Sequence, residues 1–351
     1  MRTNRVRPEV EAPDLSLAPE SVASGSGSDL VRSAAAVPSG IKAPRRIITG
    51  STVVKPNKRA RGKTALPDPR AQDDTLNELR IGIIGAGAMG GALCRGLVDS
   101  RIVPPNRIFV SDPHTKHVQE LARSHGILAA DDNLTLVRNV DIVVLAVKPY
   151  NVDLVISEIA PVLAREGEAP LIICIAAGIP TSRIEALLDS LPGVPQTPVI
   201  RAMPNTPAQV GKGACAYCRG THANASHMAQ SGAIFRSVGI AVEVPETMMD
   251  AVTALSGSGP AYIYLMIEAL IDGGVRAGLP RDIASKLASQ TVLGAAQMVI
   301  ETGMHPAQLR DMVTTPAGTT IEAIASLEHS GLRAALIDAV GKAAARSREL
   351  G

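Results

Sequence analysis

Aromatic side chains are nearly absent from this chain of 351 residues, which contains two Phe, four Tyr and no Trp. Proteins that bind single-stranded nucleic acid stack the bases on aromatic side chains, and this chain has almost none to offer. The formal net charge of +2 gives no indication of a nucleic-acid partner either. We therefore expect no nucleic-acid binding. The cores must be filled by Ala, Val, Ile and Leu, within an apolar content of 46%.

Cysteines and long apolar runs are also scarce. The four cysteines, which lie in segments predicted as helix or strand, are Cys94, Cys174, Cys215 and Cys218. Their irregular spacing fits a reducing compartment, and the single Cys-x-x-Cys pair favours two strand cysteines over a metal site. The longest apolar run, Leu171–Ile179, falls far short of the ~18–20 residues that cross a bilayer. With no apolar signal core, and with acidic residues that disfavour a transit peptide, we expect a cytoplasmic protein without metal or membrane partner.

The pattern of residues divides the chain into three parts. Residues 1–78 are rich in Ser, Pro, Ala and Arg without a sustained period, which predicts a disordered N-terminal extension. Its basic stretch 42–63 fits a solvated tail better than a contact site for RNA or membrane. Residues 79–245 alternate short apolar runs with helical stretches, which predicts an α/β fold with a parallel sheet covered on both faces. The expected strands are Ile81–Ile84, Ile108–Val110, Ile142–Val147, Leu171–Ala176, Val199–Met203 and Ala241–Val244.

Residues 246–351 are helical in pattern throughout. The expected helices are Met248–Leu255, Ala261–Ala277, Pro280–Thr302, Ala307–Val313, Thr319–Glu328 and Leu332–Leu350. The helix that begins at Pro280 and stops at Gly303 would span roughly 35 Å at 1.5 Å per residue. A compact helical domain of this size does not need so long a helix. We therefore infer an interlocked homodimer, in which another subunit packs against it.

A glycine-rich fingerprint follows the first expected strand. The residues Gly85-Ala86-Gly87-Ala88-Met89-Gly90 have the G-x-G-x-x-G spacing between a strand and a helix, which is the context that dinucleotide binding requires. Gly85 makes the tight turn, Gly87 admits the pyrophosphate, and Gly90 lets the helix pack close to the strand. These residues predict a coenzyme site.

The second strand ends at an acidic residue, Asp112. An acid at this distance from the glycine loop accepts the ribose 2′-hydroxyl of NAD, whereas NADP needs neutral or basic groups for its 2′-phosphate. His114 and Lys116 are close enough in the sequence to supply such groups. The sequence leaves the choice between NAD and NADP open.

Small and polar residues end the later strands. Ala146 and Lys148 follow the fourth strand, Ala176 and Ala177 the fifth, and Asn205 the sixth. The carboxyl ends of parallel strands line the crevice where the nicotinamide lies. Lys148 could equally be a surface lysine, and we favour the crevice.

The segment Thr314–Glu322 predicts an anion-binding cradle at the start of a helix. Thr319 and Glu322 have the capping-box spacing, so the helix begins near Thr319. The free N–H groups around Gly318, Thr319 and Thr320 then point outward, where a carboxylate can accept them. Most such loops are only turns, but together with a dinucleotide fingerprint this one suggests a redox reaction on a small acid.

From about Arg80 to Leu350 the chain resembles the pyrroline-5-carboxylate reductase family. The motifs in order are GAGAMG, AVKP, AAGIP, RAMPNTP, LSGSGPAY, GLPR, ETGMHP and TTPAGTTIEAI. The resemblance implies an α/β architecture: an N-terminal Rossmann-type doubly wound parallel sheet, followed by an all-α helical dimerisation domain. It also implies reduction of the C=N bond of 1-pyrroline-5-carboxylate to give L-proline, the last step of proline biosynthesis, with NADPH as coenzyme and NADH possible.

The same resemblance implies roles for individual residues. Thr315, Gly318 and Thr319 bind the substrate carboxylate, and the Thr320 hydroxyl acts as the catalytic group near the ring nitrogen. The implied coenzyme contacts are residues 85–90, Asn133, Ala146, Lys148, Ala176 and Ala177. Two positions depart from the family pattern: Ala317 stands where a second Gly is more frequent, and Asp112 stands where NADPH-preferring members often have a small hydroxyl residue.

Two other functions compete with this one. A β-hydroxyacid dehydrogenase-like oxidoreductase shares the architecture but depends on a catalytic lysine, for which Lys286 is the main candidate without a supporting motif. A non-catalytic dinucleotide-sensing interaction protein would use the basic tail to reach a partner. Such a sensor has no use for a substrate cradle, which argues against it.

Overall fold

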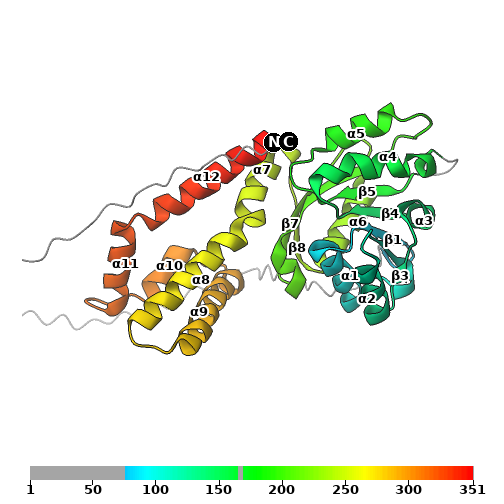
Figure 1. Ribbon diagram of the computed structural model, residues 1–351. Coiled ribbons are helices and arrows are strands. Elements are labelled where there is room, and N and C mark those ends of the chain that lie inside the picture. The colour runs from blue at the N-terminus through cyan, green and yellow to red at the C-terminus, as the bar shows by residue number, and fades with distance from the viewer. Residues whose placement is uncertain (1–75, 165–168, 351) are drawn as a thin grey trace, which may run out of the picture. The chain divides into compact units, whose positions relative to one another are not determined.

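The computed structural model describes residues 76–164 and 169–350 (Figure 1). The extension 1–78 that we expect to be disordered lies outside these residues, apart from its last three. Leu76 is wholly buried in the core, and the Glu78 carboxylate lies 3.1 Å from Arg107 Nη2. The expectation of disorder is therefore wrong for residues 76–78, because a single apolar anchor is too short to produce a period in the sequence.

The described residues form an eight-stranded sheet in the order β3-β2-β1-β4-β5-β6-β7-β8. The strands are β1 (Ile81–Ile84), β2 (Ile108–Ser111), β3 (Leu128–Ala129), β4 (Ile142–Leu145), β5 (Leu171–Cys174), β6 (Val199–Met203), β7 (Gly213–Arg219) and β8 (Gly239–Glu243). Neighbouring strands from β3 to β6 are parallel, β7 is antiparallel to β6, and β8 is parallel to β7. The chain turns back between β6 and β7 because only the short turn η4 (Thr206–Val210) joins them, and a parallel return needs a longer crossover.

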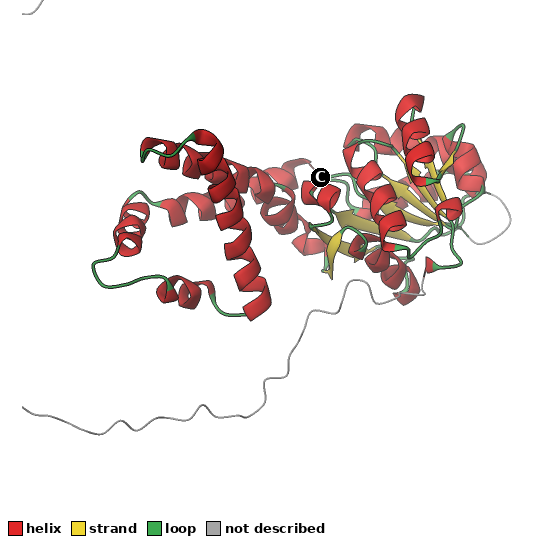
Figure 2. Cartoon of the chain, turned by 90° about the horizontal axis from the view of Figure 1, so that it is seen from below, coloured by secondary structure: helices red, strands yellow, loops and turns green. Residues whose placement is uncertain are grey.

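Alternate residues of the sheet face two separate cores, and helices cover both faces (Figure 2). One core joins the sheet to α1 (Ala88–Ser100), α2 (Thr115–His125) and α6 (Ala225–Arg236). The other joins it to α3 (Asn133–Arg138), α4 (Val152–Leu163) and α5 (Thr181–Ser190). This burial of both faces explains why the parallel strands read as continuous apolar runs, and it confirms the expected doubly wound architecture.

The strand order reverses at β1, which lies between β2 and β4. At such a switch point the loops after the two central strands diverge to opposite faces of the sheet and leave a crevice at the carboxyl ends of the strands. The glycine loop follows β1, and Ala146 follows β4. The fold therefore opens its crevice at the predicted coenzyme site.

The segment after β8 is helical, as expected. Its helices are α7 (Met249–Val252), α8 (Gly259–Arg276), α9 (Arg281–Thr302), α10 (Pro306–Met312), α11 (Thr319–His329) and α12 (Leu332–Leu350). The expected helix Met248–Leu255 is present, but its second half is the π-helical turn η6 (Thr253–Gly257), which follows α7. No residue of α8 is buried, and Ala284 and Ala288 are the buried residues of α9.

Candidate functional site

The glycine loop after β1 has the geometry of a dinucleotide site. Gly85 has φ +107°, its N–H donates to Ser111 O at 2.8 Å, and a Cβ there would lie 2.6 Å from Ala146 O. A Cβ at Gly90 would collide with the Gly85 carbonyl oxygen. Both positions therefore require glycine, the first for the turn and the second for the close packing of α1.

Gly87 differs from these two because its missing side chain faces open space. It is the N-cap residue of α1, and an added Cβ would meet nothing within 4 Å. A Cβ at this point would project into the space in front of the helix N-terminus, where N–H groups attract phosphate. Gly87, Ala88 and the start of α1 thus fit the pyrophosphate of a dinucleotide.

Asp112 holds the glycine loop in place. Its Oδ2 accepts a hydrogen bond from Ala86 N at 2.7 Å, and its Oδ1 accepts one from His114 N at 2.7 Å. The side chain is only 13% exposed. Burial alone would raise the pKa of Asp112, but the hydrogen bonds from His114 N and Ala86 N outweigh burial and lower it. Asp112 is thus an ionised carboxylate that joins the loops after β1 and β2.

The other predicted coenzyme residues line the carboxyl ends of adjacent strands. Ala146 N donates to Ile84 O at 2.8 Å, which places Ala146 beside the glycine loop. Lys148 is exposed, Ala176 is buried and Ala177 is exposed. Asn133 begins α3, where its Oδ1 accepts from the Ser111 hydroxyl and its Nδ2 donates to Glu158 Oε2 at 2.8 Å.

Asn205 is placed differently from these residues. Its side chain is 8% exposed, its Nδ2 donates to Ser256 O at 3.0 Å, and its Oδ1 accepts from Ala214 N at 2.8 Å. The Asn205 amide thus links the π-helical turn η6 to the end of β6 through hydrogen bonds. Contact of Asn205 with the coenzyme stays a prediction.

The loop before α11 differs from the predicted cradle in two respects. The N-cap residue is Gly318, in extended conformation and without a side-chain cap, and Thr319 is the first helical residue. The predicted capping box between Thr319 and Glu322 is therefore wrong, because Thr319 lies one position too late to cap. Gly318 N is also engaged, since it donates to Thr315 O at 3.0 Å. The N–H groups of Thr319 and Thr320 belong to the first helical turn, which supplies no acceptors for them.

Ala317 adopts the left-handed conformation that favours glycine, with φ 55°. An alanine there costs roughly 1–2 kcal/mol relative to a relaxed backbone. The departure from the family pattern therefore places a mild strain in the loop beside Gly318. Among the residues that the structure describes, no hydrogen bond or ion pair joins this loop to the glycine loop.

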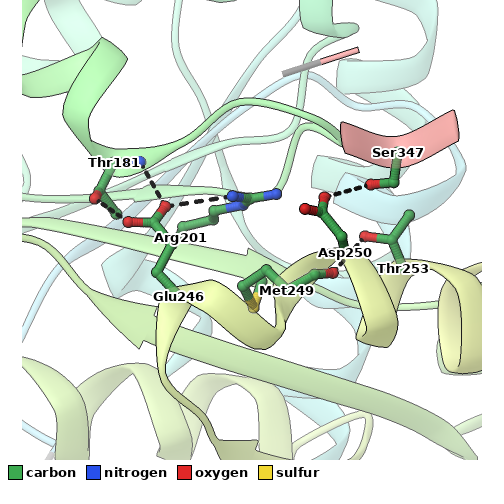
Figure 3. Close-up of polar contacts among 7 residues, drawn as sticks. All are labelled: Thr181, Arg201, Glu246, Met249, Asp250, Thr253 and Ser347. Atoms are coloured by element: carbon green, nitrogen blue, oxygen red, sulfur yellow. Dashed lines mark hydrogen bonds and ion pairs between the residues drawn. The ribbon is translucent and has the colours of Figure 1, made fainter. Parts of the chain in front are cut away.

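Figure 3 shows a polar cluster that our sequence reasoning missed. Glu246 accepts hydrogen bonds from Thr181 N at 2.8 Å and Thr181 Oγ1 at 2.6 Å, and its Oε1 lies 3.3 Å from Arg201 Nη1. The Ser347 hydroxyl donates to Asp250 Oδ1 at 2.7 Å. Glu246 thus ties the start of the helical segment to α5 and β6. The available signal was Arg201, a charged residue in an otherwise apolar strand.

The fold and the glycine loop together define a dinucleotide-dependent oxidoreductase of the Rossmann type. Family models agree in both halves of the chain. Residues 246–350 match "Pyrroline-5-carboxylate reductase dimerisation", and residues 80–178 match "NADP oxidoreductase coenzyme F420-dependent".

Individual proteins are similar along the same region. The pyrroline-5-carboxylate reductase of Methanosarcina acetivorans is 48% identical over 79% of this chain and 99% of its own length. That of Arabidopsis thaliana is 44% identical, over 77% of this chain and 95% of its own length. The chain belongs to the pyrroline-5-carboxylate reductase family.

Solved structures of family members have the same fold. The enzyme from Coxiella burnetii aligns with a TM-score of 0.73 at 37% identity, over 78% of this chain and 99% of that one. The Plasmodium falciparum enzyme, solved with NADP bound, aligns with a TM-score of 0.69 at 33% identity, over 78% and 99% of the two chains. The chain thus belongs to a family of NAD(P)-dependent oxidoreductases.

These findings decide between the competing functions. Family membership excludes the β-hydroxyacid dehydrogenase-like function, and Lys286, the candidate for its catalytic lysine, is exposed on α9. It also excludes a non-catalytic sensor. The matched dimerisation region supports a homo-oligomer.

One helical stretch, Glu246–Arg276, is long and apolar enough by length and composition to cross a membrane. The stretch lies inside the region that matches the dimerisation family. The match to a dimerisation region offers a subunit interface for its exposed apolar side chains, and nothing in the comparisons suggests a membrane partner.

Proposed function

We propose that this chain reduces the C=N bond of 1-pyrroline-5-carboxylate to give L-proline, with NADPH as the preferred coenzyme. The observation that carries the proposal is the cradle at the start of α11, because it offers N–H groups and hydroxyls in a chain that also has a dinucleotide loop. The identity of 41–48% to reductases of this name supports it. We also propose residues 79–245 and 246–351 as the two domains, and the cytoplasm as the location.

The substrate carboxylate is bound by the loop before α11. Thr319 N–H is free of intrahelical partners, and the Thr315 and Thr319 side chains are exposed. Gly318 contributes by having no side chain, since a Cβ there would collide with Thr315 Oγ1. Hydrogen bonds from the loop to a carboxylate are charge-assisted and hold the ring in a fixed orientation.

Thr320 orients the ring nitrogen. NADPH, when bound, supplies the hydride that the imine carbon accepts. The nitrogen becomes an amine, so it needs a hydrogen bond or a proton and no strong base, because the substrate can enter as an iminium ion. His305, one of the two histidines of the helical segment, agrees with this, since its Nδ1 accepts from Ala307 N at 3.2 Å and caps α10.

The coenzyme lies along the carboxyl ends of the central strands. The residues we propose to contact it are Gly85, Ala86, Gly87, Ala88, Met89, Gly90, Asp112, Asn133, Ala146, Lys148, Ala176, Ala177 and Asn205. Among these, Gly87 faces open space, as pyrophosphate contact requires. Asp112 acts mainly through the loops that it joins.

Substitution of Thr320 by Val tests the role of its hydroxyl. If this hydroxyl donates to the substrate nitrogen, Thr320→Val lowers kcat/KM by roughly 10–1000-fold, about 1.4–4 kcal/mol of transition-state stabilisation. The matched control is Thr314→Val, since the Thr314 hydroxyl is occupied by Arg310 O at 2.8 Å. We expect the control to stay within about threefold of wild type. Equal activity of both variants at subsaturating 1-pyrroline-5-carboxylate would refute the role of Thr320.

A further inference from the structure

A cavity of about 350 Å³ lies in the groove between α1 and α2, beside the glycine loop. Gly87 and Ala88 line it from the loop, Arg95 from α1, and His117 and His125 from α2. Basic side chains thus meet the open side of the helix N-terminus. The coenzyme contacts proposed above include the glycine-loop side of this cavity, and they leave Arg95, His117 and His125 without a role.

Arg95 folds back along α1 toward the glycine loop, as side chains on a helix tend to do. A Cβ at Gly91 would lie 3.3 Å from Arg95 Nη1, so the guanidinium covers Gly91, one helical turn beyond Gly87. Arg95 is half-buried. Within residues 76–164 and 169–350, no carboxylate forms an ion pair with it. A guanidinium with unused donors therefore faces the cavity.

His117 presents its ring from the opposite wall. It stacks on His114, with ring centroids 6.0 Å apart and planes at 26°. His114 Nδ1 in turn lies 3.2 Å from Asp112 Oδ1. The His117 ring nitrogens make no hydrogen bond to any residue that the structure describes, so they are available to a ligand.

The carboxylate of Asp112, the residue that would select NAD, is occupied by hydrogen bonds within the protein. Oδ2 accepts from Ala86 N, and Oδ1 accepts from His114 N and lies beside the His114 ring. A carboxylate has about four acceptor positions, and recognition of a ribose diol needs them to face the coenzyme. Three contacts within the protein leave Asp112 little capacity for that role.

We propose that Arg95, together with His117, binds the 2′-phosphate of NADPH in this cavity and thereby sets the coenzyme preference. This proposal rests on the proposed function in one respect, since it assumes that the ligand of the glycine loop is a nicotinamide dinucleotide. A guanidinium forms paired hydrogen bonds to phosphate oxygens, which an ammonium group does not. Glu120 also lines the cavity, and its charge opposes the anion.

The test is calorimetric titration of the purified full chain with 2′,5′-ADP and with 5′-AMP, which differ in the 2′-phosphate alone. Wild type binds 2′,5′-ADP more tightly. Arg95→Met lowers the affinity for 2′,5′-ADP about tenfold or more, the size of one charge-assisted hydrogen bond, and leaves 5′-AMP unchanged. Glu120→Gln raises the affinity for 2′,5′-ADP. Lys116→Met, which removes a basic group from the start of α2 outside the cavity, leaves both unchanged.

Three results would overturn the proposal. Wild type could bind 2′,5′-ADP and 5′-AMP with equal affinity, Arg95→Met could lose affinity equally for both nucleotides, or Lys116→Met could lose affinity for 2′,5′-ADP alone. If Arg95→Met fails to fold, the affinity of Glu120→Gln for 2′,5′-ADP tests the proposal instead. The titrations contain no 1-pyrroline-5-carboxylate. The nucleotide affinities can therefore be interpreted even if the chain lacks the proposed reductase activity. The ratio of kcat/KM for NADPH to that for NADH supplies an independent readout.

Discussion

The sheet half and the helical half of this chain bury their apolar residues in opposite ways. All four residues are buried in each of β1, β4 and β5. In α8, by contrast, none of 18 residues is buried, and Leu265 is 68% exposed. The sheet half therefore completes its cores within one chain, whereas the helical half leaves its apolar side chains to another subunit.

This contrast has an energetic consequence. Full burial of a Leu or Ile side chain stabilises a protein by about 1.5–3 kcal/mol. The exposed large apolar residues of α8 and α9 are Ile263, Tyr264, Leu265, Leu270, Ile283, Leu287, Leu293, Met298, Val299 and Ile300. Their contribution is gained on association, so the stability of the helical half depends on protein concentration, and that of the sheet half does not.

The largest expected effect comes from a charge on the helical surface. Leu265→Asp dissociates the homo-oligomer, because a carboxylate cannot be buried unpaired in an apolar interface. The matched control is Leu154→Asp on α4, since Leu154 is also 68% exposed in the single chain. Light scattering coupled to size exclusion should give a smaller mass for Leu265→Asp alone. If Leu154→Asp dissociates the homo-oligomer, or if neither variant does, the claim that only the helical half buries its apolar side chains against another subunit is contradicted.

A smaller effect is expected at the cluster that joins the halves. Glu246→Gln removes the charge that faces Arg201, whose side chain is 9% exposed. We expect a loss of roughly 1.5–3 kcal/mol in the free energy of unfolding, the range for hydrogen bonds to charged groups. The control is Asp272→Asn in the exposed ion pair with Arg281, for which we expect less than about 1 kcal/mol. Equal losses in chemical denaturation would show that Glu246 does not tie the two halves together.

The smallest effect concerns the acid in the sheet half. The folded pKa of Asp112 is lowered, so its stabilisation is present above the unfolded pKa of about 3.9 and is lost as the pH falls through the folded value. Asp112→Asn should cost about 1–2 kcal/mol near neutral pH, independently of protein concentration. The difference from wild type should shrink below about pH 4. A difference that stays constant down to pH 3 would contradict the ionised state assigned to Asp112.

The sequence predicts the architecture well where a period is long or a motif is rigid. The Ile81–Ile84 strand, the glycine turn and the start of the helix at Thr319 all follow from local pattern. The strand Leu128–Ala129 is only two residues long, too short to be recognised from a residue pattern. The reversed direction of β7 depends on a short connection between strands and not on its own composition.

The candidate site is less predictable, because residue types do not fix which hydrogen bonds form. Thr319 has the spacing of a cap, yet Gly318 takes the N-cap position, where a side chain would collide with Thr315 Oγ1. Asn205 and Asp112 stand at strand ends as coenzyme ligands would, but their side chains are engaged with Ser256, Ala214, Ala86 and His114. These partners are remote in the sequence or lie in loops, so only the fold reveals them.

The most direct test of the whole account is the stoichiometry of the reaction. The full chain is incubated with 1-pyrroline-5-carboxylate and NADPH, and coenzyme oxidation is followed by absorbance while proline is quantified by mass spectrometry. The account predicts one proline formed for each NADPH oxidised, with the rate strongly reduced in Thr320→Val. NADPH oxidation without proline, or no oxidation by a folded homo-oligomer, would contradict it.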